Sequence, residues 1–325
     1  MGKVGLSRNV RVVTASDHQP LVVIVVLNWN GRDDTIRCAE SVQQLRYPRC
    51  IPVVVDNGST DGSVDVLRGR FPGLDVIETG RNLGYAGGNN AGIDWALSRG
   101  ADYVLILNND TIVDPDALTE LTHVAGGDRT IGIVGPKVLC EPDRHLIYSC
   151  GESQSLWFNV RQLGMGQPDR DVGRSPRDVD YVVGCAILVS REFIERVGLL
   201  DEVFFAYYDE VDWCFRGRRL GYRVVCAPSA VVYHKGEASS GKGLNPITAY
   251  YRTRNWVYFM RKHASTHHWL AFVPVFAAVF LSRLATALVR ADCAVVGSLF
   301  RAVWWHLSPH SSFGRISPAA FRAAR

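Results

Sequence analysis

The chain has 325 residues, of which 47% are hydrophobic and 21% are charged, so it can bury a large core and is not globally disordered. Its net charge of +4 is too small to indicate a polyanionic partner by itself. The charge is unevenly distributed, however. Residues 252–325 carry ten Lys and Arg and one acid, Asp292, for a net charge of +9, whereas residues 1–251 carry −5. The sequence therefore describes an acidic body followed by a basic tail.

The eight cysteines form no Cys-x-x-Cys pair, and several lie in apolar runs. This pattern predicts reduced, buried thiols and neither disulfides nor a zinc site. Residues 1–20 are polar and lack the apolar core of a signal peptide, so we expect a flexible N-terminal segment and a cytoplasmic location.

From Leu21 onward, short apolar runs alternate with amphipathic stretches. Strands are expected at 21–27, 51–55, 74–77 and 103–107, and helices at 33–45, 63–70 and 88–98. Continuous β-branched runs between helices indicate parallel strands that are covered on both faces. The predicted fold class is therefore α/β, with a doubly wound, mostly parallel and Rossmann-like sheet.

The next elements follow a helix that starts at Pro115. Strands are expected near 131–139, 179–189, 222–226 and 230–234, with a surface loop at 164–177 and helices at 191–197 and from about Asp209 to Leu220. The order of elements continues the α/β pattern of the first half.

Polar loops follow four of the expected strands, at residues 28–31, 56–62, 81–90 and 108–110. Ligands bind to sheets of this class beyond the carboxyl ends of the strands. Asn, Asp and Gly are also ordinary turn residues, but four such loops at one edge of the sheet together indicate a ligand site.

Two groups of acids are candidates for chemistry. Asp110 closes a strand, where a carboxylate can meet a metal ion and phosphates; its alternative role is that of an N-cap or turn former. Asp209 and Glu210 begin a helix after an aromatic run. An apolar flank would raise the pKa of Glu210 and strengthen it as a base, and the alternative is a favourable interaction with the helix dipole.

The acid and the base four residues apart on that helix, Asp212 and Arg216, predict a helical ion pair.

His234 ends a strand just before a small, polar loop at 236–243. A strand-end histidine at this place could bind a metal ion while the loop closes over a substrate; the alternative is a core histidine. The loop also fits GxxxxGK, the start of the P-loop of nucleotide hydrolases. Gly243 stands where that motif requires Ser or Thr, and Pro246 follows where a helix should begin, so we interpret the match as chance.

Five segments in this order resemble the family-2 glycosyltransferases of GT-A fold: VVIVVLNWNG, VVVDNGSTDGS, RNLGYAGGNNAGI, LILNNDTIVDP and FFAYYDEVDWCFRGRRLGY. The resemblance covers about residues 21–262 and is strongest to the rhamnosyltransferase-like branch, which acts on cell-envelope or polysaccharide glycans. It implies a catalytic domain at 21–245, with a nucleotide-sugar half at 21–139 and an acceptor half at 140–245. Residues 246–325 form a basic and apolar C-terminal helical region.

The resemblance also implies a role for individual residues on the donor side. The first polar loop would frame the nucleotide base, Asp56 would hydrogen-bond it, and the third loop would line the diphosphate and the sugar. The residues implied to bind the nucleotide or donor are Leu27, Asn28, Asn30, Asp56, Asn82, Gly84, Asn89, Asn108 and Asn109.

The Asp-x-Asp metal motif of the family falls on Asn108-Asn109-Asp110, so the first acid is absent here. Asp110 and His234 would then hold a divalent ion, Mn or Mg, whose shell the diphosphate oxygens complete. The family has Glu-Asp where this chain has Asp209-Glu210. Glu210 takes the place of the general base, with Asp209 as the alternative.

Tyr208 and Trp213 are assigned to the acceptor side of the site. The implied reaction is an inverting transfer from a nucleotide-diphosphate sugar, dTDP-rhamnose or a UDP-sugar, to a glycan or lipid-linked acceptor in cell-envelope or polysaccharide synthesis. A carboxylate removes the proton of the acceptor hydroxyl while the metal neutralises the departing diphosphate. A non-catalytic nucleotide-sugar-binding protein on the same fold is the alternative.

The tail begins with an aromatic and basic stretch, 246–262, that predicts a helix packed on the body. Residues 269–282 are uncharged but too few to span a bilayer. Taken as one helix, 269–307 would place Arg283, Arg290 and Arg301 on one face, which is typical of an interfacial helix on anionic lipid.

Asp292 lies on the opposite side and spoils that pattern. A helical pair packed on the catalytic domain and a single spanning helix are the alternatives. We expect peripheral attachment to the inner face of the cell membrane. Nucleic-acid binding is not expected, because the basic residues alternate with a long apolar run. The sequence carries no indication of an oligomeric state.

Overall fold

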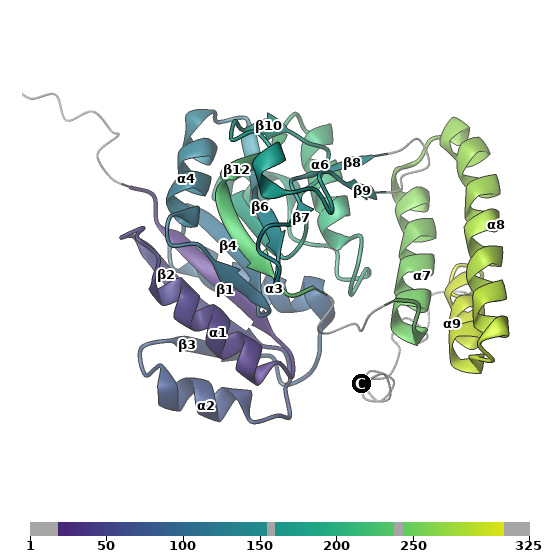
Figure 1. The fold of residues 1–325 in the computed structure, drawn as a ribbon, viewed down its shortest axis with the longest axis horizontal. Helices are drawn as coiled ribbons and strands as arrows, with labels where there is room; N and C mark the ends of the chain where they lie inside the picture. Colours follow the sequence, from purple (N-terminus) through teal and green to yellow (C-terminus); the bar gives the residue numbers. More distant parts are fainter. Residues whose placement is uncertain (1–18, 155–159, 237–242, 309–325) are drawn as a thin grey trace, which may run out of the picture.

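The computed structural model describes residues 19–154, 160–236 and 243–308, and a mixed α/β sheet forms its centre (Figure 1). The strand order is β10-β12-β6-β11-β4-β1-β2-β3, with β5 added beside β12 and β7 beside β6. The predicted flexible segment at 1–20 lies almost wholly outside the described residues.

The strands are β1 Val22–Asn28, β2 Cys50–Asp56, β3 Asp75–Glu78, β4 Tyr103–Asn108, β5 Thr111–Val113, β6 Ile131–Cys140, β7 Ile147–Ser149, β8 Glu152–Gln154, β9 Val160–Gln162, β10 Arg177–Asp178, β11 Ala186–Ser190 and β12 Arg223–His234. The α-helices are α1 Arg32–Gln43, α2 Ser63–Arg70, α3 Gly84–Ser98, α4 Ala117–Gly127, α5 Arg191–Val197, α6 Asp209–Arg219, α7 Pro246–His263, α8 Thr266–Val289 and α9 Cys293–Trp304.

The sheet is mostly parallel, as the sequence predicted. Strands β3, β2, β1 and β4 run parallel, and β12 runs parallel to β6. Strand β11 runs antiparallel between β4 and β6, and the short strands β5, β7 and β10 also pair antiparallel with their neighbours. Alternate residues of β1 enter two different cores, with Val23 and Val25 on one face and Val22 and Ile24 on the other. This two-sided burial explains why the strand is apolar at every position.

Two predicted strands differ in extent. The strand expected at 179–189 is shorter and begins at Ala186, because residues 179–185 first run past β12 and β8, where the Val179 amide donates to the Val224 carbonyl at 2.9 Å. The strands expected at 222–226 and 230–234 are one strand, β12, whose register shifts between Ala227 and Val231. Pro228 lies within this shift and has no amide hydrogen to donate to the ladder, which explains why the regular pairing is interrupted there.

The cysteines are reduced thiols in the structure. Five of the eight are buried, and Cys293 is exposed. Burial, as the sequence predicted, therefore holds for most of the cysteines, and the absence of disulfides stays a prediction.

The C-terminal region is a helical layer beside the body, formed by α7, α8 and α9 (Figure 1). The single helix considered for 269–307 is wrong: α8 ends at Val289 and α9 begins at Cys293. Asp292 causes the break, because its Oδ1 caps α9 by accepting the Val295 amide at 3.0 Å. The acid that disturbed the amphipathic pattern is thus a helix cap.

Candidate active site

The polar loops predicted to form one site do meet at the carboxyl ends of the strands. In the sheet register Asn28 lies opposite Asp56, and Leu27 lies opposite Asn108. The Asn28 amide donates to Asp56 Oδ1 at 2.9 Å, and Asn109 Nδ2 donates to Asn28 Oδ1 at 3.1 Å. Three loops that are far apart in the chain are therefore joined by direct hydrogen bonds.

The first two loops form a frame around Ser59. The Asn30 amide donates to Ser59 Oγ at 2.9 Å, and the Ser59 amide donates to Asp56 Oδ2 at 2.9 Å. Asp56 is 3% exposed, so its carboxylate orients the loops by accepting these bonds. Its predicted contact with a nucleotide base stays a prediction.

The third loop is organised by Asn57, which no sequence argument had singled out. Its Nδ2 donates to Asn82 Oδ1 at 3.2 Å and to the Gly84 carbonyl at 3.0 Å, and its Oδ1 accepts the Leu83 amide at 2.9 Å. The Asn82 oxygen also accepts the Gly84 amide at 2.8 Å. Helix α3 therefore begins at Gly84, four residues earlier than expected.

Glycines at the start of α3 let the donor loops and the aromatic run approach each other. Gly84 has a φ of 78°, and any Cβ there would collide with Phe205. A Cβ at Gly88 would collide with Leu27. Asn89 is fully buried on the same helix, with its Nδ2 bonded to the Tyr85 carbonyl at 3.0 Å and its Oδ1 unpartnered among the described residues.

Asp110 and His234 come together, as predicted for a metal site. His234 lies opposite Thr111 in the ladder between β12 and β5, and its Nε2 is 3.2 Å from Asp110 Oδ1. Both side chains are 6% exposed. Neither ring nitrogen of His234 has a hydrogen bond in the described part of the chain, and the ring contacts Tyr148 edge-on at 5.1 Å.

These two side chains fit a divalent cation as a partial protein shell. A buried imidazole without hydrogen-bond partners beside a carboxylate is a ligand set that takes Mn²⁺ or Mg²⁺ when other oxygens complete it. Among residues 19–154, 160–236 and 243–308, three or more ligating side chains are not gathered at any one place. The protein alone therefore does not complete such a shell.

Asp209 and Glu210 form the first turn of α6 but lie in different surroundings. Asp209 is 2% exposed. Burial, the charge of Glu210 and a hydrogen bond with it raise the pKa of Asp209 well above its usual value. Glu210 is half-buried and faces Gly184, where a Cβ would lie 3.5 Å from Glu210 Oε1. Of the two carboxyl groups, Glu210 is the one that solvent reaches.

A third carboxyl group, Glu152 at the start of β8, also belongs to this cluster. It is 5% exposed, and burial together with the charge of Glu210 raises its pKa to about 8. The buried thiol of Cys185 has its pKa raised by burial and by the charges of Asp110, Glu152 and Glu210. The carboxyl groups of Asp110, Glu152 and Glu210 therefore all act on Cys185, which directly precedes β11.

Of the two residues assigned to the acceptor side, the structure places only Tyr208 beside the acids. Tyr208 is the N-cap of α6, with a φ of 71°. Trp213 is fully buried, donates its indole N–H to the Gly198 carbonyl at 2.7 Å and packs edge-on against Phe193. Trp213 therefore contributes to the core, and its placement gives no support to an acceptor role.

Helix α7 holds the aromatic run 204–208 in place. Asn255 is fully buried, and its Nδ2 donates to the carbonyls of Phe204 at 3.0 Å, Ala206 at 2.6 Å and Tyr207 at 2.8 Å. Arg254, 1% exposed, donates to the Phe204 carbonyl at 2.8 Å. The positive φ values of Tyr207 and Tyr208, 66° and 71°, are stabilised by these bonds.

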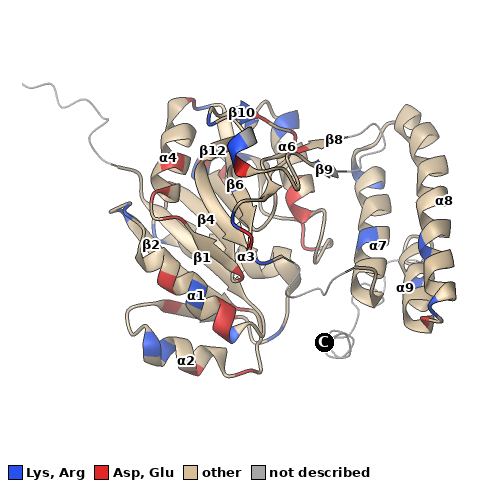
Figure 2. Cartoon of the chain, in the orientation of Figure 1, with Lys and Arg blue, Asp and Glu red and all other residues tan. Residues whose placement is uncertain are grey.

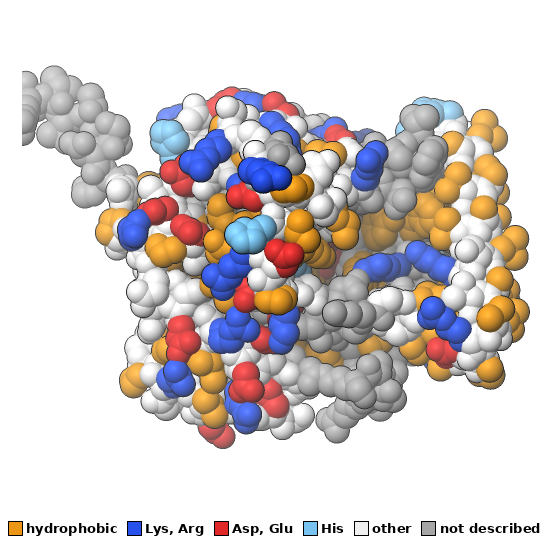
Figure 3. All heavy atoms as spheres, in the orientation of Figure 1, with side chains coloured by type: hydrophobic (Ala, Val, Ile, Leu, Met, Phe, Trp, Pro, Cys, Tyr) orange, Lys and Arg blue, Asp and Glu red, His pale blue; other side chains and the backbone are white. Residues whose placement is uncertain are grey.

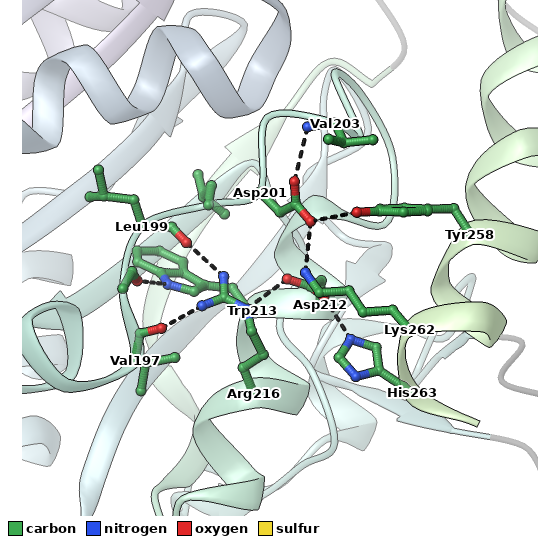
Figure 4. A network of polar contacts seen from close by, with 12 residues as sticks. Val197, Leu199, Asp201, Val203, Asp212, Trp213, Arg216, Tyr258, Lys262 and His263 are labelled. Carbon is green, nitrogen blue, oxygen red and sulfur yellow. Dashed lines mark hydrogen bonds and ion pairs between the residues drawn. The ribbon is translucent and has the colours of Figure 1, made fainter. Parts of the chain in front are cut away.

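A second link between α6 and α7 centres on Asp212, which is fully buried (Figure 4). The predicted ion pair with Arg216 is confirmed at 2.7 Å, from Nε to Oδ2. In addition, Lys262 Nζ lies 2.9 Å and His263 Nε2 lies 2.6 Å from Asp212 Oδ1. Lys262 also reaches Asp201 at 2.7 Å. The start of α6 is thus tied to the end of α7.

Sequence reasoning missed Asn57, Glu152, Gly184 and Asn255. One signal was present for Asn255: Arg254-Asn255 lies within an aromatic helix, and polar side chains in such a place are buried only with partners. The P-loop match falls largely on residues 237–242, which lie outside the described residues.

The chain belongs to glycosyl transferase family 2, whose family model matches residues 22–198. It is 26% identical over 230 residues to the dTDP-rhamnosyl transferase RfbF of Shigella flexneri, covering 68% of this chain and 74% of that protein. It is 27% identical over 235 residues to the N-acetylglucosaminyl-diphospho-decaprenol L-rhamnosyltransferase of Mycobacterium tuberculosis. The match covers 65% of this chain and 75% of that protein.

A third relative is the low-salt glycan biosynthesis hexosyltransferase Agl10 of Haloferax volcanii, 31% identical over 199 residues, which are 60% of this chain and 61% of that protein. Among solved structures, GalNAc-T7 with UDP, GalNAc and Mn²⁺ has a TM-score of 0.61 at 16% identity, over 75% of this chain and about half (48%) of its own.

The mannosyltransferase PcManGT of Pyrobaculum calidifontis with GDP-Man and Mn²⁺ has a TM-score of 0.54 at 18% identity. The match covers 94% of this chain and 79% of the chain of PcManGT. These structures establish the GT-A type fold. Family and fold together make this chain a glycosyltransferase of the hexosyltransferase type, as the sequence resemblance implied.

Proposed function

We propose that the chain transfers a sugar from a nucleoside-diphosphate sugar to a glycan hydroxyl with inversion at the anomeric carbon, and that Glu210 is the general base. One observation carries this proposal: Glu210 lies in the first turn of α6 at the carboxyl edge of the sheet and is only half-buried, while its neighbour Asp209 is buried. A carboxylate that a substrate can reach can take the proton of an attacking hydroxyl.

The polar loops at the ends of β1, β2 and β4 would bind the donor. Asn28, Asp56 and Asn57 fix the loop shapes by hydrogen bonds, and Asn89 has a side-chain oxygen without a hydrogen-bond partner among the described residues. Since the relatives include a dTDP-rhamnosyl transferase and an L-rhamnosyltransferase by name, rhamnose is the sugar that we propose. A UDP-sugar is the alternative donor.

Asp110 and His234 would hold a divalent metal ion, Mn or Mg, and the burial of the two side chains with His234 Nε2 only 3.2 Å from Asp110 Oδ1 supports this assignment. Both solved neighbours contain Mn²⁺ by title. When bound, such an ion supplies charge that stabilises a departing diphosphate. Asn108 precedes these ligands at the end of β4, and its amide donates to the Cys185 carbonyl at 2.9 Å.

We further propose that the enzyme works at the cytoplasmic face of the membrane on a lipid-linked glycan, in cell-envelope or polysaccharide synthesis. Helix α8, with 24 residues and a mean hydropathy of 2.0 in its apolar window, is long and apolar enough to cross a membrane, and 11% of that window is buried. The name of the mycobacterial relative states a lipid-diphosphate acceptor for that protein.

The test is an assay of nucleoside diphosphate release from a panel of nucleotide sugars, with Mn²⁺, with Mg²⁺ and with a chelator. We expect one donor to react in the presence of metal. Glu210→Gln should retain donor binding and lose at least about 100-fold in turnover, because the isosteric amide cannot accept the proton. Asp209→Asn is the matched control and should lose less.

Near-wild-type transfer by Glu210→Gln would refute the base assignment, and the reverse ranking of the two variants would move the role to Asp209. Donor binding without any diphosphate release would favour the alternative of a non-catalytic nucleotide-sugar-binding protein.

A further inference from the structure

The space beside Gly184 lies directly in front of the proposed base. A Cβ added to Gly184 would lie 3.3 Å from Tyr85 Oη and 3.5 Å from Glu210 Oε1. A carbon fits there only tightly, but an oxygen at these distances needs a shift of a few tenths of an ångström to hydrogen-bond with both atoms. Gly184, Tyr85 and Glu210 are each half-buried. The missing side chain of Gly184 therefore leaves room for one oxygen atom within reach of the Glu210 carboxylate.

Tyr85 fixes the walls of this space. Its hydroxyl donates to the Gly184 carbonyl at 2.5 Å, and its amide donates to the Phe205 carbonyl at 2.6 Å. Phe205 belongs to the aromatic run that leads into the first turn of α6, where Glu210 lies. One residue at the start of α3 thus holds both the Gly184 segment and the segment that precedes the base.

The same space adjoins the segments proposed to bind the donor. The residue after Gly184 is Cys185, whose carbonyl accepts the Asn108 amide at 2.9 Å. The proposed metal ligand Asp110 follows two residues after Asn108, and Tyr85 lies within the third polar loop. An atom beside Gly184 therefore stands between the base and the donor loops. The attacking oxygen of an inverting transfer needs such a place, because it must reach the anomeric carbon and a base at once.

The molecule is hollowed between the body and the C-terminal helices (Figure 3). Helix α7 stands on the C-terminal side of this hollow (Figure 1), and its residue Asn255 binds the aromatic run 204–208. Because that run leads directly into α6, the hollow adjoins the turn that carries Glu210. It is the side from which we expect an acceptor larger than water to approach the base.

We propose that the attacking hydroxyl of the acceptor binds in the space beside Gly184, and that Gly184 and Tyr85 are positioning residues for the attack. The hydroxyl oxygen forms a bond to the anomeric carbon of the donor, and Glu210 takes the proton of the hydroxyl. The bond between that carbon and the diphosphate breaks, and the diphosphate leaves with the bonding electron pair. The inference rests on the proposed function and adds the place of the attacking oxygen and the two residues that shape it.

The experiment uses Gly184→Ala in the full chain, because the added methyl group would occupy the space of the attacking oxygen. The probe is the nucleotide sugar that reacts in the donor panel, with Mn²⁺ present and water as the attacking molecule. Release of the nucleoside diphosphate measures turnover, and titration calorimetry with that nucleoside diphosphate measures binding at the donor loops. Gly184→Ala should release diphosphate at least about tenfold more slowly and should bind the nucleotide like the wild type.

Gly69→Ala is the matched control, because a Cβ at this exposed glycine of α2 meets nothing within 4 Å; it should match the wild type in both measurements. Tyr85→Phe removes the hydroxyl that holds the Gly184 carbonyl and should also slow release without weakening nucleotide binding. If Gly184→Ala unfolds more easily, Tyr85→Phe carries the comparison.

Wild-type rates of release by both variants would overturn the inference, and so would a loss of nucleotide binding that accounts for the whole effect. Glu210→Gln separates the two claims. If it is inactive while Gly184→Ala and Tyr85→Phe keep the wild-type rate, the proposed function stands and only this inference fails. If the wild type releases diphosphate from none of the donors, the proposed function fails and this inference fails with it.

Discussion

At the scale of single residues, the site separates carboxyl groups by their surroundings. Asp209 and Glu152 are nearly inaccessible, at 2% and 5% exposure, and both have raised pKa values, whereas Glu210 is only half-buried. Burial favours the neutral form of a carboxyl group, so the surroundings of Asp209 and Glu152 disfavour their charged forms.

Glu152 gives a prediction about pH and stability. Its folded pKa of about 8 lies above its usual value of 4.5, so between these pH values the folded state binds more protons than the unfolded state. The stabilisation is complete below pH 4.5 and is lost as the pH rises to about 8. Glu152→Gln should therefore melt about 2–4 °C above the wild type at pH 9, with little difference at pH 5.

Thermal unfolding followed by circular dichroism between pH 5 and 9 measures this difference. Glu195→Gln, on the exposed face of α5, is the control. Its melting temperature should differ from that of the wild type by the same amount at every pH. If the melting temperature of Glu152→Gln changes with pH in parallel with that of the wild type, the Glu152 carboxyl group does not titrate between pH 5 and 9.

At the scale of elements, α7 supports the aromatic run 204–208 and the first turn of α6, which carries the proposed base. Its residues Asn255 and Arg254 bind the carbonyls of the aromatic run, and Lys262 and His263 bind Asp212 of α6. The end of the catalytic domain at residue 245, expected from the sequence, stays a prediction. The hydrogen bonds from α7 to the aromatic run and to α6 join residues on the two sides of that boundary. The loop 204–208 adopts left-handed conformations only because a neighbouring helix satisfies its carbonyls.

Asp212→Asn should be strongly destabilising. Burial alone would raise the pKa of Asp212, but the hydrogen bond from His263 and the charges of Arg216 and Lys262 lower it. Removing the carboxylate leaves these cations without their buried partner, which costs about 3 kcal/mol. The ionised Asp212 carboxylate therefore stabilises the folded state at pH values above the usual pKa of an Asp. This stabilisation is lost as the pH falls through the lowered pKa of Asp212.

Urea unfolding at pH 7 measures the change in the free energy of unfolding. Arg196→Ala breaks the exposed pair of Arg196 and Glu192, also four residues apart, and should cost no more than about 0.5 kcal/mol. Equal costs for the two variants would mean that the Asp212 cluster is no more than a surface ion pair.

At the scale of the whole molecule, the charge asymmetry of the chain has a structural counterpart. The body carries charged side chains of both signs, whereas α8 is almost free of them (Figure 2). The arginines once expected to share a lipid-facing stripe are separated by the break at 290–292, and Arg283 faces inward to Thr253. What faces outward on α8 is apolar.

Replacing Leu270, Leu281 and Leu288 together by Glu should abolish membrane attachment. These side chains are exposed on one face of α8, and each Glu would have to be desolvated in the interface. Flotation of the full chain with vesicles containing phosphatidylglycerol is the measurement. Val66→Glu, a substitution at an exposed apolar position of α2, should leave attachment unchanged. If the triple variant floats like the wild type, α8 is not the attachment surface.

Much of the fold and part of the site followed from the sequence. The apolar runs of the parallel strands and the polar loops after them were predicted, because strand periodicity and parallel topology bring strand ends to one edge. The pairing of Asp110 with His234 was implied by the resemblance to the family. The roles of Asn57, Glu152 and Asn255 did not follow, because each acts through contacts between segments that no local pattern connects.

The sequence by itself determined the family, the α/β class and the edge of the sheet at which the polar loops meet. These depend on local periodicity and on motifs whose residues are adjacent in the chain. Only the tertiary structure decided that Trp213 belongs to the core, that α8 and α9 are separate helices, and that Arg283 turns toward Thr253 of α7. These outcomes depend on burial and on long-range hydrogen bonds, whose energies arise only when distant segments pack together.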